Sequence, residues 1–92
     1  MILCAGEALI DMLPRRTATG EAAFAPHPGG AVFNTAIALG RLGAEAGFLC
    51  GLSDDLFGTQ LAAALAESGV ATDLCPCSAP PTTLAFVTPT DG

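Results

Sequence analysis

The stretch GGAVFNTAIALGRLG, residues 29–43, decides how this chain folds. Its two opening glycines allow a positive φ and let another molecule approach bare backbone N–H groups. Apolar residues then recur at helical spacing, and Gly43 stands where a helix stop is expected. The pattern predicts a helix that is apolar on nearly all sides and therefore buried.

Asn34 is the polar exception in this helix. In the first turn, its amide can donate and accept hydrogen bonds beside the free N–H groups of the helix start. Together with Gly29 and Gly30, it suits a neutral polyhydroxyl ligand. From the residues alone, a buried Asn that satisfies its own helix end is the alternative.

The composition is rich in core residues for a chain of this size, since 51% of the 92 residues are hydrophobic and 13% are charged. Surface should dominate such a small chain, so we expect further protein to cover this one. The net charge of −6 argues against nucleic-acid binding. No run approaches the roughly 18 apolar residues of a membrane span. Residues 1–10 lack the basic start of a signal peptide, so we expect a cytoplasmic protein with reduced thiols.

The four cysteines do not follow the usual spacing of a metal site. Cys4 and Cys50 lie in apolar runs and are expected to be small core residues. Cys75 and Cys77 form a C-x-C without a second pair, which is a weak indication of zinc.

The first strand is predicted over residues 1–10, as a run buried on both faces with Asp11 at its end. Ligands of open α/β sheets bind beyond the carboxyl ends of parallel strands, where a carboxylate can accept two hydroxyl hydrogen bonds. From position alone, a solvated turn aspartate is the alternative for Asp11. A second buried strand is predicted over residues 45–52, parallel to the first and joined to it through the helix.

The polar, proline-containing segment 12–28 is long for a connection between a strand and its helix. It can hold one or two short strands, and its size suggests a flap or lid. His27 lies between two prolines and is expected to be a rigid loop residue rather than a catalyst.

Further along the chain, Asp54 and Asp55 are expected to cap a helix over residues 56–68 rather than to bind a metal. A short strand is predicted at residues 70–75 and a clear one at 82–88. The final Asp-Gly pair is a hairpin signal with no strand after it, which we take as a sign that the chain is cut short.

Three ordered motifs resemble the N-terminal signatures of the ribokinase-like (PfkB) carbohydrate kinases, and of fructokinases in particular. They are GEALID at residues 6–11, Gly-Gly-x-x-x-Asn with Arg-Leu-Gly within 29–43, and GLSDDLFG at 51–58. The resemblance covers nearly the whole chain. It implies an α/β fold, in which residues 1–92 are the N-terminal part of a three-layer sandwich with a small β lid. The lid segments would be about residues 12–28 and 82–92.

The resemblance also implies which residues bind the substrate. Carried over to this chain, Asp11 and Asn34 would bind sugar hydroxyls, and Gly29 with Gly30 would bring backbone against the sugar. The lid residues Thr83 and Phe86 would approach it.

The implied activity is the ATP-dependent, Mg²⁺-assisted phosphorylation of a sugar, with fructose as the first candidate substrate. Ribose, 2-keto-3-deoxygluconate, a nucleoside and tagatose 6-phosphate are alternative substrates, and a non-catalytic sugar-binding module is the alternative class. The family's Gly-Ala-Gly-Asp region, with its catalytic aspartate and nucleotide pocket, has no counterpart here. We therefore assign no catalytic residue and expect the chain alone to be inactive. A homodimer through the lid follows from the family likeness only.

Overall fold

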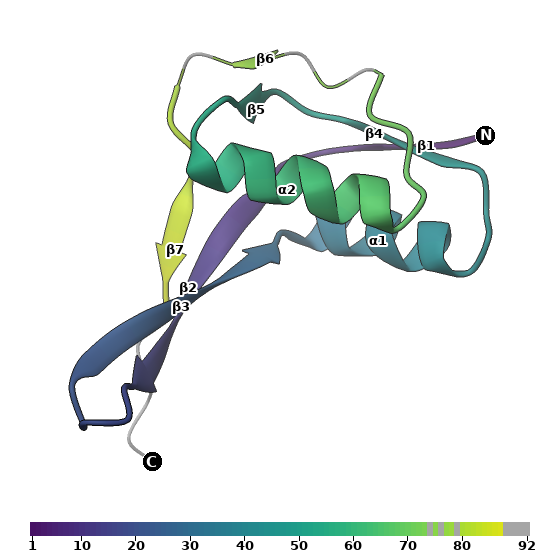
Figure 1. The fold of residues 1–92 in the computed structure, drawn as a ribbon. Helices are drawn as coiled ribbons and strands as arrows, with labels where there is room; N and C mark the ends of the chain where they lie inside the picture. The colour runs from purple at the N-terminus through teal and green to yellow at the C-terminus, as the bar shows by residue number, and fades with distance from the viewer. Residues whose placement is uncertain (74, 76, 79, 88–92) are drawn as a thin grey trace.

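Figure 1 shows the computed structural model of the chain, which describes residues 1–73, 75, 77–78 and 80–87. Two helices cover one side of a small parallel sheet, and a second, three-stranded sheet extends away from them (Figure 1). The predicted turn at Asp91-Gly92 lies outside the described residues, as does the side chain of Cys77.

The parallel sheet pairs β1 (Ile2–Ala5) with β4 (Ala46–Leu49), so that Cys4 lies opposite Phe48. Helix α1 (Ala31–Arg41) contacts both strands. This arrangement confirms the predicted parallel pair and the helix between its two strands.

The prediction of one continuous strand over residues 1–10 is wrong, because the strand is interrupted at Gly6. The residues before and after Gly6 form two strands that belong to different sheets. A β-carbon on Gly6 would lie only 2.7 Å from Cβ of Val32, so the start of α1 presses against this corner. Strand β2 (Leu9–Arg16) begins after the corner. Asp11 therefore lies inside β2 and not at the end of β1.

Segment 12–28 forms a longer hairpin than the one or two short strands predicted. Strand β2 pairs antiparallel with β3 (Ala22–Gly29) over eight residue pairs. Prolines are tolerated on edge strands whose N–H groups face solvent, and β3 is an edge strand that carries Pro26 and Pro28. On its other side β2 pairs in parallel with β7 (Leu84–Phe86), the described part of the strand predicted at 82–88.

Helix α2 (Leu56–Glu67) follows the short strand β5 (Leu52–Ser53), which pairs in parallel with β6 (Cys77–Ser78). The strand predicted over residues 45–52 is thus divided into β4 and β5. The strand predicted at 70–75 is reduced to one bridge between Ala71 and Gly47 in the described residues.

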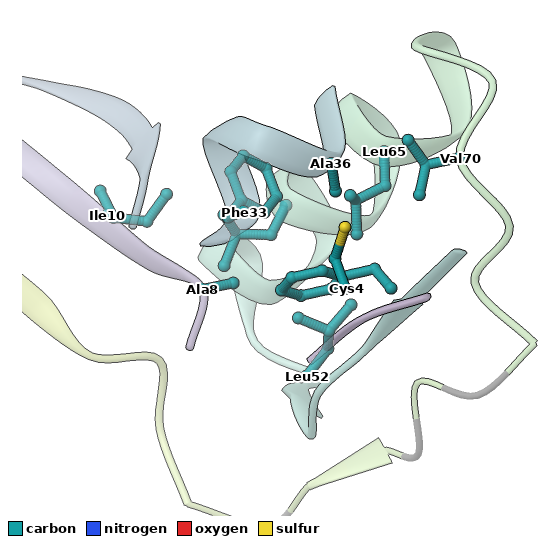
Figure 2. Packing of buried hydrophobic residues seen from close by; sticks show 10 residues of the cluster. Cys4, Ala8, Ile10, Phe33, Ala36, Leu52, Leu65 and Val70 are labelled. Carbon is teal, nitrogen blue, oxygen red and sulfur yellow. The ribbon is translucent and has the colours of Figure 1, made fainter. Parts of the chain in front are cut away.

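The core lies between the two helices and the parallel sheet (Figure 2). Phe33 of α1 packs edge-on against Phe48 of β4, with ring centroids 5.8 Å apart. The prediction that α1 is buried nearly all round is wrong, because only Phe33 and Ala36 are buried. Val32, Ile37 and Leu39 are partly buried against the core, and the face of α1 that carries Asn34, Thr35 and Ala38 is exposed in the part of the chain that the structure describes.

Strand β1 also departs from the prediction of burial on both faces. Ile2 is 49% exposed and Leu3 is 48% exposed, whereas Cys4 is buried. The reason is that β1 is one edge of a two-stranded sheet. Neither described helix has the length and apolar character needed to cross a membrane.

Candidate functional site

The side chain of Asp11 lies over the backbone of Gly29. Asp11 is the third residue of β2 and lies opposite His27 of β3, two residues before Gly29. A β-carbon at position 29 would overlap Oδ2 of Asp11 and would lie 3.1 Å from its Cγ. The absence of a side chain at Gly29 therefore gives the carboxylate its position.

Gly30 turns the chain from β3 into α1. Its φ of 109° is one that residues with a side chain rarely adopt, and a β-carbon there would lie 2.5 Å from the carbonyl oxygen of Glu7. No side chain caps the helix, and the first intrahelical bond runs from the N–H of Asn34 to the carbonyl of Gly30 at 2.8 Å. The N–H groups of residues 31–33 have no acceptor among the described residues, so a partially positive helix end follows directly after Gly29.

Asn34 is placed differently from the other predicted site residues. It is exposed, and it lines a pocket of about 250 Å³ together with Pro28, Ile37 and Arg41. The alternative of a buried Asn that satisfies its own helix end is wrong. The structure thus brings Asp11, Gly29 and Gly30 together, while the side chain of Asn34 faces a pocket that does not include Asp11.

A second pocket of about 180 Å³ lies between the β1–β2 corner, strand β5 and the segment that leads into β7. Its walls include Glu7, Ser53 and Thr83. Because the carbonyl of Glu7 lies against Gly30, this pocket adjoins the start of α1.

Asp55 takes part in an arrangement that sequence reasoning missed. As predicted, it caps α2, accepting the N–H of Gly58 at 2.7 Å. It also accepts both the hydroxyl and the N–H of Thr82, at 2.6 and 2.8 Å. These hydrogen bonds from Thr82, followed by the one from Gly58, lower the pKa of Asp55 from 3.8 to about 2. The local capping signal predicted the first contact, but no signal in the sequence links residue 55 to residue 82.

The two predicted lid residues take different positions at the outer sheet. Phe86 is the register partner of Met12, next to Asp11, so alternation places it on the face away from Asp11, contrary to the expectation. There it packs edge-on against Phe24, with centroids 5.2 Å apart. The carbonyl of Thr83 accepts the N–H of Ile10 at 3.0 Å, which holds Thr83 beside β2.

The described cysteine side chains are free thiols. Cys4 is buried as predicted, whereas Cys50 is half-buried. The thiol of Cys75 donates to the carbonyl of Phe48 at 3.2 Å, and its partial burial raises its pKa.

The arrangement of helices and sheets is shared with solved sugar kinases. The fructokinase of Xylella fastidiosa with bound ATP superposes with a TM-score of 0.86 at 43% identity, covering 92% of this chain and 28% of that one. A PfkB protein from Polaromonas sp. JS666 superposes with a TM-score of 0.84 at 32% identity, covering 98% of this chain and 32% of that one. The described fold is therefore the N-terminal part of a ribokinase-like α/β sandwich.

Sequence comparisons agree with the fold. The model of the family described as "pfkB family carbohydrate kinase" matches residues 1–92. A fructokinase of Rhizobium leguminosarum bv. trifolii is 56% identical over 87 residues, which are 95% of this chain and 27% of that protein. Fructokinase-1 of Oryza sativa subsp. japonica is 45% identical over 73 residues, which are 76% of this chain and 23% of that protein. The chain belongs to the pfkB family of carbohydrate kinases, and it spans about a quarter of the length of these curated relatives.

Proposed function

We propose that this chain supplies the sugar-binding part of an ATP-dependent sugar kinase whose substrate is fructose. The observation that carries the proposal is the carboxylate of Asp11 lying over Gly29 at the entrance to an uncapped helix. The 56% identity to the Rhizobium fructokinase supports fructose as the sugar.

Each predicted site residue has a role in this proposal. Asp11 accepts hydrogen bonds from sugar hydroxyls, and Gly29 leaves room for both its carboxylate and the sugar. Gly30 exposes the first N–H groups of α1 as donors. Asn34 contributes its amide when the sugar contacts the first turn of α1. The sheet of β2, β3 and β7 acts as a lid over the sugar, with residues 12–28 and 82–92 as its segments.

The cationic side chains of the described residues are not gathered at this site. The chain's three cationic side chains are arginines, and Arg15 and Arg16 bond to the backbone at the far end of the hairpin. The third, Arg41, lies in the last turn of α1. We therefore place ATP, its Mg²⁺ and the catalytic groups in other parts of the kinase, and we derive no step of phosphoryl transfer from these residues.

A chimera tests the proposal. In it, this chain replaces the matching segment of the Rhizobium leguminosarum fructokinase, and an ADP-coupled assay follows turnover with fructose. We expect the chimera to turn over, and we expect Asp11→Asn to raise the KM for fructose at least about tenfold, as for the loss of a hydrogen bond to a charged group. Asp54→Asn changes an exposed carboxylate outside the site and is the matched control.

The other outcomes distinguish the alternatives. Turnover with ribose, 2-keto-3-deoxygluconate, a nucleoside or tagatose 6-phosphate but not with fructose would show that the proposed substrate is wrong. The proposed reaction class, sugar phosphorylation, would stand. Sugar binding without any turnover, measured by calorimetry, would favour a non-catalytic module. An unchanged KM for fructose in Asp11→Asn would contradict the role of Asp11.

A further inference from the structure

The carboxylate of Asp55 joins two segments that are 27 residues apart in the sequence. One oxygen accepts the N–H of Gly58, in the first turn of α2, and the hydroxyl of Thr82. The other oxygen accepts the N–H of Thr82. Charge-assisted hydrogen bonds of this kind are stronger than those between neutral groups. The start of α2 and the entry to β7 are therefore held together by one side chain, and in Figure 1 β7 begins beside the first turn of α2.

The position of Thr82 determines how β7 lies against β2. The carbonyl of the next residue, Thr83, accepts the N–H of Ile10 at 3.0 Å, and Ala85 is the register partner of Asp11. Strand β7 has three residues and lies at the edge of its sheet. Such a short edge strand has few hydrogen bonds of its own to set its register, so an anchor immediately before it has a large influence.

The chain approaching this anchor is stiff. Pro80 and Pro81 directly precede Thr82, and proline fixes φ near −65°. Both prolines line the pocket of about 180 Å³ together with Thr82 and Thr83. Fixing Thr82 therefore also fixes one wall of that pocket.

We propose that Asp55 is a positioning residue for the sugar site. By holding Thr82, it sets β7 in register beside Asp11 and fixes one wall of the pocket of about 180 Å³. The inference rests on the proposed function and adds to it a residue that acts through Thr82 rather than by touching the sugar.

A purely structural role is the competing explanation, because Asp55 also caps α2. Replacing Asp55 removes the cap and the anchor together, so Thr82 is the better place for a substitution. Thr82→Val removes the hydroxyl that donates to Asp55 and leaves the bonds from the N–H groups of Thr82 and Gly58 in place. Thr82→Ser keeps a hydroxyl at the same position.

The matched control is Thr59→Val. The hydroxyl of Thr59 bonds to the backbone carbonyl of Asp55 at 3.1 Å and leaves the carboxylate untouched. All three variants are made in the chimera, with the KM values for fructose and ATP and the thermal unfolding midpoint measured for each.

We expect Thr82→Val to raise the KM for fructose about tenfold while the KM for ATP stays within about twofold. Thr82→Ser restores the KM for fructose, and Thr59→Val leaves both KM values unchanged. A lower unfolding midpoint of Thr82→Val with an unchanged KM for fructose would overturn the inference, because it would reduce Asp55 to a structural role. Equal rises in the two KM values would also overturn it. If the unsubstituted chimera turns over no sugar, the proposed function fails first and this inference fails with it.

Discussion

At the scale of single residues, Gly29 makes room for Asp11. A β-carbon at position 29 would overlap the carboxylate, which would have to rotate away from its place beside α1. In the chimera we therefore expect Gly29→Ala to raise the KM for fructose about tenfold, the effect of weakening one hydrogen bond to a charged group. The KM for ATP should stay near that of the unsubstituted chimera, and steady-state assays that vary each substrate measure both values.

Gly43→Ala is the control for this substitution. Gly43 has a φ of 85°, and no heavy atom lies within 4 Å of the position that a β-carbon would take there. Alanine at this position therefore strains the backbone without touching a neighbour. We expect a lower unfolding midpoint and an unchanged KM for fructose. If Gly29→Ala behaves in the same way, the position of Asp11 does not depend on Gly29.

At the scale of elements, Gly40 lets α1 approach the end of α2. A β-carbon at Gly40 would lie 2.8 Å from Cγ2 of Val70 and would overlap the carbonyl oxygen of Ser68. Alanine is favoured over glycine in a helix by about 1 kcal/mol, but overpacking costs about 1–3 kcal/mol. We expect Gly40→Ala to lower the unfolding midpoint of the chimera by a few degrees, measured by scanning calorimetry.

Ala38→Gly provides the comparison for Gly40→Ala. Ala38 is exposed on the same helix, so this change costs only the helix propensity, about 1 kcal/mol. A midpoint raised by Gly40→Ala would mean that propensity outweighs packing and that the two elements do not meet as closely as described.

The hydrogen bonds to Asp55, the cap of α2, predict how the unfolding midpoint depends on pH in acid. Hydrogen bonds from Thr82 and Gly58 lower the pKa of Asp55 from 3.8 to about 2 in the folded chain. A carboxyl with a depressed folded pKa stabilises the fold fully above pH 3.8 and loses that contribution as the pH falls towards 2. We expect the unfolding midpoint of the chimera to fall more steeply across this pH range than that of Asp55→Asn. Asp54→Asn should keep the steep dependence, and equal slopes for Asp55→Asn and the chimera would contradict the prediction.

At the scale of the whole molecule, the isolated chain presents an apolar surface on and beside β1. Ile2, Leu3 and Leu49 are between 41% and 49% exposed, and Met1 is 72% exposed. Exposed sheet edges with apolar side chains favour association. We expect the isolated 92-residue chain to self-associate and to bind a hydrophobic dye, measured by size-exclusion chromatography with light scattering and by fluorescence.

Lysine on this surface should reduce the association. Ile2→Lys places a charge on the edge strand, whereas Leu56→Lys places one at the exposed start of α2 and is the control. A soluble monomer with a sharp, cooperative thermal transition would show that the chain folds stably without further cover.

The two helices were predictable because their signals are local. Glycines bound the predicted stretch 29–43, in which α1 occupies residues 31–41, and Asp55 and Gly69 bound α2 at residues 56–67. The hairpin was underestimated because prolines disfavour strands in general. Pro26 and Pro28 lie on the edge strand β3, and Pro14 lies in β2 beyond the residues that pair with β7. Whether a strand lies at an edge is decided by its neighbours in the sheet, and local sequence does not contain that information.

The sequence by itself determined the helices, their ends, the cap at Asp55 and the motifs that identify the family. The helices, their ends and the cap depend on residues within about one turn of one another, where spacing along the chain sets distance in space, and the motifs are read from the order of the residues. Only the tertiary structure decided that the first strand is interrupted at Gly6, that Asp11 lies over Gly29 and that Thr82 donates hydrogen bonds to Asp55. These contacts join residues far apart in the sequence, so the local spacing of residues does not specify them.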